Sequence, residues 1–546
     1  MLPVLSLSNI LRLFHTVRYL RLRQIGYRLW YRFRNPVPGL RPAPSMRQLL
    51  GCWRTPVSKP VAMVAVDRFR FLNKTYTISG AADWNSPALP KLWLYNLHYF
   101  DDLIAVNAET RKSWHFDLIQ LWVTENPPGK GNGWEPYPIS LRAVNWIKWA
   151  LAGNVLPEEV GHSLVVQIRL LRQRLEYHLL GNHLWANGKA LIFAGLFFEG
   201  SESDGWLDKG MEIVKRELAE QVLFDGGHFE RSPMYHAIIL EDLLDLVNLS
   251  NAYEREVDQD WLTAIAMMRT WLEGMSHPDG RIALFNDAAF GIAPTWQELE
   301  AYARRLQLRP SEYHFPLLTH FPDSGYIRLQ GLQAVALLDV APVGPDYIPG
   351  HAHADTLSFE LSVFGQRVLV NSGTSTYEKT AERHRQRGTA AHNTVSVNGQ
   401  DSSEVWGGFR VARRARPFGL ETREDVDSCF VKCAHDGYRR LPGKPVHWRQ
   451  WHWMEGSLVV RDTIDGPFEK ACARYHFHPE VKLVSEGSWR QGRVILPSGH
   501  EVCWQVNNGQ ATLMDSTWHP EFGITISNRC LEIALDGPTA EVVFSW

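Results

Sequence analysis

The period of the hydrophobic pattern changes near residue 320, and this change limits the fold more than any other feature of the chain. Before it, apolar residues such as Leu141, Val144, Ile147 and Leu151 recur at helical spacing. After it, short runs rich in β-branched and aromatic residues, such as 334–340, alternate with Gly, Asn and Asp. A chain of 546 residues is also longer than a single hydrophobic core usually supports. We therefore expect a helical domain followed by a β-rich domain.

Three regions follow from this pattern. Residues 1–65 form a basic N-terminal arm and linker, residues 66–320 a helical domain, and residues 321–546 an antiparallel β-domain. Helices of similar length with short links favour a toroid or a solenoid, and many short strands favour a β-sandwich. Ser232 and Pro233 are typical of the cap and the first position of a helix.

The first region is positively charged, and no acidic residue precedes Asp67. Its cations are Arg12, Arg18, Arg21, Arg23, Arg28, Arg32, Arg34, Arg41, Arg47, Arg54 and Lys59. Such an arm could contact an anionic membrane surface, guide an acidic glycan, or be a solvated basic helix. Arg12 and Arg18 interrupt its apolar residues early, which makes it a poor secretory signal, and no later run is long enough to span a bilayer.

Charge and composition narrow the class of partner. The formal net charge of −2 gives the chain no bulk attraction for polyanions, and we expect no nucleic-acid partner. The 22 Trp and 17 Tyr suit stacking on sugar rings, although protein cores also use aromatic side chains. The six cysteines form no paired motif, so we expect a reduced chain, which favours the cytoplasm.

Four polar clusters lie where elements are expected to begin or end. In residues 350–355, just ahead of an expected strand, His351 and His353 would share a face that Asp355 could join. The other clusters are residues 181–183, 229–236 and 387–394. A single histidine in any of them is most simply structural. Amides, imidazoles and phenols at element ends in both halves together indicate a site.

This ordered set resembles the heparinase II/III superfamily of polysaccharide lyases. The matching pieces, spread over about residues 75–420, are residues 134–138, 142–146, Asn182-His183 with Asn187, 232–236, 351–359 and 391–394. The resemblance implies an (α/α) toroid followed by an antiparallel β-sandwich. It also implies an enzyme that cleaves a uronate-containing acidic polysaccharide by β-elimination. The expected location is the cytoplasm or the inner membrane of a bacterium, with the periplasm as the alternative.

The resemblance assigns roles to the polar clusters. Asn182 would neutralise the uronate carboxylate, helped by His351 and His183. Tyr235 would be the acid and, for some stereochemistries, also the base. Whether His183, Tyr377 or Tyr235 itself removes the C5 proton stays open.

Further residues would lower the pKa of the Tyr235 phenol or contact the substrate. A free phenol titrates near about 10, so Arg231, His236 or the imidazole at position 351 would have to favour the phenolate of Tyr235. Trp134 and Tyr137 are expected sugar platforms. Arg231, His236 and Arg410 are expected to contact substrate, and Arg410 could clamp a carboxylate.

The family often carries zinc in its β-domain, and the resemblance implies His353 and His392 as ligands here. Asn371 stands where an acidic ligand is expected, and a neutral amide binds zinc more weakly than a carboxylate does. Asp355 or water could complete the site. Such a zinc would be structural and would brace the segment that carries His351.

Three other functions remain open. A uronate C5-epimerase could use the same proton abstraction. A glycoside hydrolase would need two carboxylates across a glycosidic bond, and no motif in the sequence indicates such a pair. A non-catalytic glycan-binding homologue could have kept the fold. The sequence names neither the polymer nor the oligomeric state.

Overall fold

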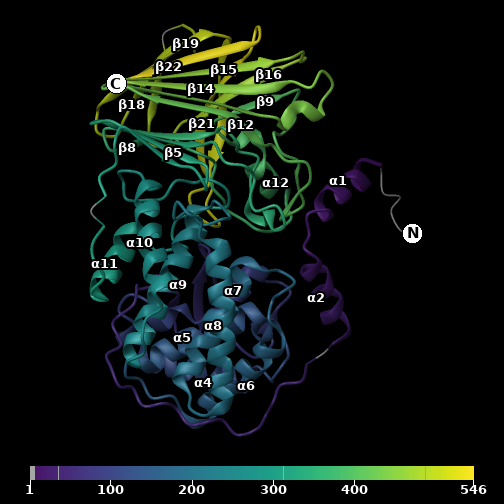
Figure 1. The fold of residues 1–546 in the computed structure, drawn as a ribbon, viewed down its shortest axis with the longest axis vertical. Helices are drawn as coiled ribbons and strands as arrows, with labels where there is room; N and C mark the ends of the chain where they lie inside the picture. The colour runs from purple at the N-terminus through teal and green to yellow at the C-terminus, as the bar shows by residue number, and fades with distance from the viewer. Residues whose placement is uncertain (1–6, 35, 312, 486) are drawn as a thin grey trace.

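The computed structural model describes residues 7–34, 36–311, 313–485 and 487–546, which form a helical part and a β-rich part stacked end to end (Figure 1). The helices of the first part are Lys91–Tyr99 (α3), Lys112–Glu125 (α4), Pro136–Leu151 (α5), Glu158–Gln173 (α6), Gly181–Phe197 (α7), Ser201–Gln221 (α8), Pro233–Ala252 (α9), Gln259–Gly274 (α10) and Trp296–Arg305 (α11). Helix α7 contacts both α5 and α8. A single apolar cluster joins these helices and includes Trp146 and Trp185.

The start of α9 matches its sequence signal. The Ser232 hydroxyl accepts a hydrogen bond from the Tyr235 amide at 3.3 Å, and Pro233 occupies the first turn. The cap satisfies one of the amides that a helix start leaves without a partner. It therefore fixes the first turn of α9, which carries Tyr235.

The β-rich part contains three main antiparallel sheets. The five-stranded sheet has the order Leu318–Phe321 (β4), Tyr326–Gln330 (β5), Ala334–Asp339 (β6), Phe359–Val363 (β7) and Gln366–Leu369 (β8). The eight-stranded sheet has the order Pro417–Glu424 (β12), Ser428–His435 (β13), Val446–Met454 (β14), Ser457–Asp465 (β15), Thr539–Ser545 (β22), Glu501–Asn508 (β19), Gln491–Ile495 (β18) and Lys482–Val484 (β17). The four-stranded sheet has the order Gln510–Trp518 (β20), Ile526–Ala534 (β21), Ala471–His476 (β16) and Val395–Val397 (β9). The predicted order of a helical part followed by antiparallel sheets is confirmed.

One apolar cluster receives side chains from all three sheets, for example Leu361, Trp451 and Leu531. A tight hairpin joins β7 and β8, because Val363 pairs with Gln366 across a two-residue turn. The turn residues Phe364 and Gly365 have φ of 51° and 76°, the left-handed conformation that tight hairpins favour.

Shorter elements complete the chain. The small sheets are Met63–Ala65 (β1), Arg68–Phe71 (β2) and Lys74–Thr77 (β3), and the pair Val405–Trp406 (β10) and Arg410–Val411 (β11). Helix Ala381–Arg387 (α12) lies where the two parts meet (Figure 1). Helices Leu7–Val17 (α1) and Leu22–Phe33 (α2) lie along the outside of the molecule. Within the described residues, no helix is both long and apolar enough to cross a bilayer.

Candidate active site

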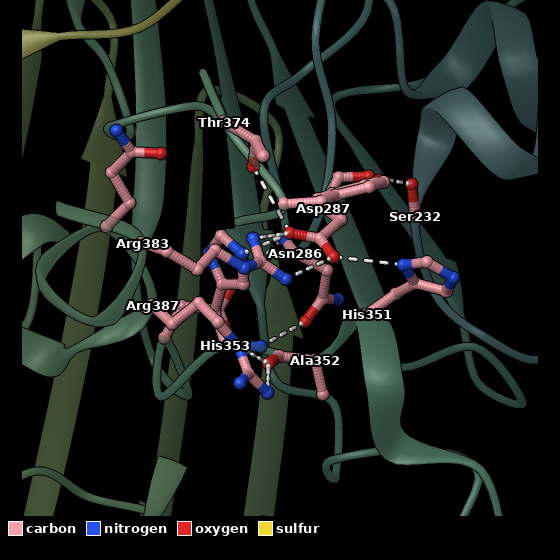
Figure 2. A network of polar contacts seen from close by, with 12 residues as sticks. Ser232, Asn286, Asp287, His351, Ala352, His353, Thr374, Arg383 and Arg387 are labelled. Atoms are coloured by element: carbon pink, nitrogen blue, oxygen red, sulfur yellow. Dashed lines mark hydrogen bonds and ion pairs between the residues drawn. The ribbon is translucent and has the colours of Figure 1, made fainter. Parts of the chain in front are cut away.

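Asp287 joins the two parts of the molecule at the centre of a buried polar network (Figure 2). It lies between α10 and α11 and accepts hydrogen bonds from His351 Nδ1 and His353 Nε2, both at 2.9 Å. The Arg383 guanidinium on α12 binds both carboxylate oxygens. Burial alone would raise the pKa of Asp287, but Arg383 and the two imidazoles hold it well below its usual range.

This carboxylate fixes the tautomer of both imidazoles. Ionised Asp287 can only accept hydrogen bonds, so His351 donates through Nδ1 and His353 donates through Nε2. The opposite nitrogen of each ring does not contact this carboxylate. For His351 this nitrogen is Nε2, which lies 3.8 Å from Glu230 Oε2.

Tyr235 lies directly against His351, with 4.1 Å between the ring centroids. Its hydroxyl is 3.0 Å from the Tyr377 hydroxyl. Burial, the Tyr377 phenol and the nearby Asp287 charge raise the pKa of Tyr235 well above its usual value. The neighbours therefore favour the phenol over the phenolate, the reverse of the sequence expectation.

Asn182 and His183 are on the first turn of α7, which touches this network. Leu180 and Gly181 have φ of 68° and 56°, and a Cβ at Gly181 would lie 3.0 Å from Glu230 Oε1. Among the described residues, the side-chain amide of Asn182 has no hydrogen-bond partner. The start of α7 therefore places Gly181, the residue before Asn182, directly against Glu230.

His183 lies at the edge of the network. Its Nδ1 is 3.0 Å from Glu176 Oε1, and its ring is 4.5 Å from the Tyr137 ring. Burial would lower the pKa of His183, but the Glu176 carboxylate raises it above the usual value. About a third of its side chain is exposed, so this imidazole is accessible to a ligand. Tyr137 is half-buried beside it.

Glu230 had no role in the predicted lyase site. It is 1% exposed, and neither carboxylate oxygen has a hydrogen-bond partner among the residues that the structure describes. Burial raises the pKa of Glu230, which favours the neutral acid. Asp287, considered only as a carboxylate for the glycoside hydrolase alternative, and Arg383 likewise had no predicted lyase role. A lone acid and a lone arginine in loops or short helices form no pattern along the chain.

Two predicted substrate contacts, Trp134 and His236, are buried and need correction. Trp134 is buried, and its indole donates to the Asn126 carbonyl at 3.2 Å, so it offers no face to a sugar. His236 is stacked on Trp271 and bonds the Met268 carbonyl, so it belongs to the helical core.

The two arginines predicted to contact substrate meet the network through their backbone carbonyls, which accept from Asn286 and Arg387, and not through their side chains. Arg231 donates to the carbonyls of Ser324 and Phe229 and thereby braces the junction. Arg410 is exposed and lies over the Trp406 ring, with 4.7 Å to its centroid.

A second cluster behind the network could hold a cation. One ligand atom from each of His353, Asp355 and His392 lies within 4.8 Å of the other two, and all three residues are buried. His353 Nδ1 and His392 Nε2 have no hydrogen-bond partner. Asn371 Oδ1 lies 3.3 Å from His392 Nδ1, which leaves the other nitrogen of that ring available. Two imidazoles and a carboxylate are a donor set that suits zinc.

Fold and site together define a two-part protein in which a helical half and antiparallel sheets share one buried network of acids, imidazoles and phenols. The family model for the heparinase II/III N-terminus matches residues 107–314, and the heparinase II/III-like C-terminal model matches residues 316–545. The chain belongs to the heparinase II/III-like family.

Individual relatives are more distant. A heparin-sulfate lyase of Bacteroides stercoris is 28% identical over 253 residues, which are 42% of this chain and 37% of that protein. The FtsZ-localized protein C of Caulobacter vibrioides is 25% identical over 443 residues, which are 76% of this chain and 74% of that protein. A crystal structure of heparinase III superposes with a TM-score of 0.66 at 18% identity and covers 82% of this chain and 76% of that chain. The match to the Bacteroides stercoris lyase therefore spans well under half of the length of that protein, 37%.

Proposed function

We propose that the protein is a polysaccharide lyase that cleaves a uronate-containing acidic polysaccharide by β-elimination. We also propose that its helical part closes as an (α/α) toroid and that its sheets pack as a β-sandwich. One observation carries the activity: the phenol of Tyr235, whose pKa is raised, lies against the imidazole of His351, whose Nε2 is left available by Asp287. The family to which the chain belongs supports the proposal, and a heparin-sulfate lyase is among its relatives.

Elimination first needs the uronate carboxylate to be neutralised, because its charge opposes the formation of a carbanion at C5. The Asn182 amide and the first turn of α7 would supply hydrogen-bond donors and the positive end of a helix dipole. Neutral Glu230 would add an O–H donor in the same place. A carboxylic acid can serve an anionic substrate only while it holds its proton.

Two residues would transfer protons. His183 Nε2 would take the C5 proton, since its Nδ1 is held by Glu176. The electrons of the C5–H bond would form the C4–C5 double bond as the C4–O bond breaks. Tyr235 would give its proton to the leaving oxygen, which its raised pKa favours. Afterwards Tyr235 regains a proton and His183 releases one to solvent.

A zinc ion fits the cluster of His353, Asp355 and His392, and we propose that these residues hold it. The ion would have a structural role, because it would link the 351–355 segment to residue 392. Asn371 would orient His392 through Nδ1 instead of acting as the third ligand.

The test is incubation of the purified protein with a panel of uronate polymers, including heparan-like, alginate-like and bacterial capsular polymers. The expected product carries a conjugated double bond and absorbs new ultraviolet light. Tyr235→Phe should abolish this absorbance without unfolding the protein, whereas Trp406→Phe should retain it. If no polymer yields unsaturated ends, the lyase proposal is wrong.

Two alternatives give different outcomes in the same assay. Deuterium uptake at C5 from heavy water without chain cleavage would indicate a C5-epimerase. Polymer binding with neither reaction would indicate a non-catalytic homologue. The second alternative has one supporting observation: the relative that covers 76% of the chain is named for FtsZ localisation and not for a lyase activity.

A further inference from the structure

The two N-terminal helices, α1 and α2, carry an apolar surface that no described part of the chain covers. In α2 the positions Leu22, Ile25, Leu29, Trp30 and Phe33 are exposed, and Leu22 and Phe33 reach 88% and 84%. Most of these positions are three or four residues apart, so they lie on one side of the helix. We call this side the apolar stripe of α2.

The opposite side of α2 is fixed to the body. Buried Gln24 donates to the Tyr347 carbonyl at 3.2 Å, and the Tyr31 hydroxyl donates to the Leu175 carbonyl at 2.6 Å. The Tyr27 and Tyr177 rings lie 4.7 Å apart. The helix is therefore docked through its polar and tyrosine side, and the apolar stripe faces away from the body.

Helix α1 repeats this arrangement. Its Thr16 hydroxyl accepts a hydrogen bond from the Trp406 indole at 3.1 Å, and Arg12 pairs with Glu404 at 3.8 Å. The apolar residues Ile10, Leu11, Leu13, Phe14 and Val17 are exposed. Both helices lie on the outer side of the molecule in Figure 1.

The charge beside these stripes is positive. Arg18, Arg28 and Arg32 are exposed on or between the two helices, whereas the exposed Arg21 pairs with Glu220 of the body. The sequence has no acidic residue before Asp67. A symmetric contact with a second copy would bring these cations against one another. A polyanionic chain would match the arginines but would leave the apolar stripes in water. An anionic lipid surface offers negative headgroups and an apolar layer beneath them.

We propose that α1 and α2 form an interfacial anchor that binds an anionic membrane surface. The helices would lie in the plane of the interface, with the stripes among the acyl chains and the arginines at the headgroups. Because Gln24 rests on Tyr347, four residues before His351, the anchor holds the candidate active site beside the bilayer. This inference stands independently of the proposed lyase activity.

The experiment is co-sedimentation of the full chain with vesicles of phosphatidylcholine alone or mixed with phosphatidylglycerol. The wild type should bind the mixed vesicles, bind the neutral ones at least tenfold more weakly, and lose affinity as salt rises. The double variant Leu29→Glu and Phe33→Glu should bind the mixed vesicles at least tenfold more weakly. Leu332→Glu with Phe224→Glu is the matched control, since these side chains are 100% and 92% exposed elsewhere. The control should bind like the wild type.

Several results would overturn the anchor. One is no binding of the wild type to mixed vesicles at low salt. Another is binding that Arg28→Gln with Arg32→Gln abolishes but the Leu29 and Phe33 variant does not, which would indicate a polyanion site. A third is a dimer in sedimentation velocity that the Leu29 and Phe33 variant dissolves, with no vesicle binding. Unchanged circular dichroism and thermal unfolding of each variant would exclude misfolding as the cause.

Discussion

At the scale of single residues, Asp287 determines which nitrogen of two imidazoles is available to a ligand. A neutral amide in its place could donate as well as accept, so neither tautomer would be fixed. It would also leave the Arg383 guanidinium buried without a counter-charge. Removing one partner of a buried ion pair costs more than the pair itself contributes.

Asp287→Asn should therefore lower the free energy of unfolding by about 3–5 kcal/mol and abolish lyase activity. Urea unfolding followed by fluorescence measures the first effect. Thr374→Val is the control, because its hydroxyl meets the same carboxylate at a long 3.3 Å and should cost less than about 1 kcal/mol. Equal losses in both variants would contradict the central role of the carboxylate.

The Glu176 and His183 pair gives a pH prediction. The carboxylate raises the pKa of His183, and a base acts only when it is unprotonated. Activity should therefore rise with pH through this raised pKa. Glu176→Gln removes the charge, lowers the pKa of His183, and should move the acidic limb of kcat/KM to lower pH. An acidic limb that stays in place would show that His183 is not the base.

At the scale of elements, the start of α7 depends on one glycine. Gly181 has a positive φ, and a Cβ there would lie 2.5 Å from Ile348 Cδ1 and 3.0 Å from Glu230 Oε1. Both the backbone and the contact exclude a side chain. The close approach sets the first turn of α7, which carries Asn182, against Glu230 and Ile348.

Gly181→Ala should cost about 1–3 kcal/mol and lower activity by displacing Glu230. Gly205→Ala within α8 is the matched control, since a Cβ there meets nothing within 4 Å and φ is not positive. It should stabilise the helix by roughly 0.5–1 kcal/mol. Thermal unfolding distinguishes the two, and a neutral Gly181→Ala would contradict the proposed contact.

Local signals in the sequence predicted local structure well. The cap at Ser232 and the turn at Phe364 and Gly365 are set by neighbours along the chain, so they could be predicted. The burial of Trp134 and His236 depends on which helix face meets which neighbour, and residue type alone does not indicate it. Asp287 acts only through partners more than sixty residues away in sequence, and no local pattern contains that information.

At the scale of the whole molecule, the cation cluster should contribute to the stability of the junction. If zinc links His353, Asp355 and His392, the purified protein should contain about one zinc per chain. A strong chelator should lower Tm by several degrees, because the metal binds only the folded state. His392→Ala should lose the metal, whereas substitution of the exposed His452 of β14 by Ala should keep it. Metal analysis and calorimetry report this without an activity assay, and a metal-free protein with an unchanged Tm would exclude the site.

The position of Asp287 also has a consequence for how the chain can be divided. Its carboxylate comes from the segment between two helices of the first part, and its partners His351, His353 and Arg383 come from the second. Expressed separately, one fragment would carry an uncompensated anion and the other an uncompensated cation, each facing solvent across a newly exposed surface. The two halves should therefore unfold in one cooperative transition. Neither half could be exchanged in evolution unless the ion pair between Asp287 and Arg383 were rebuilt.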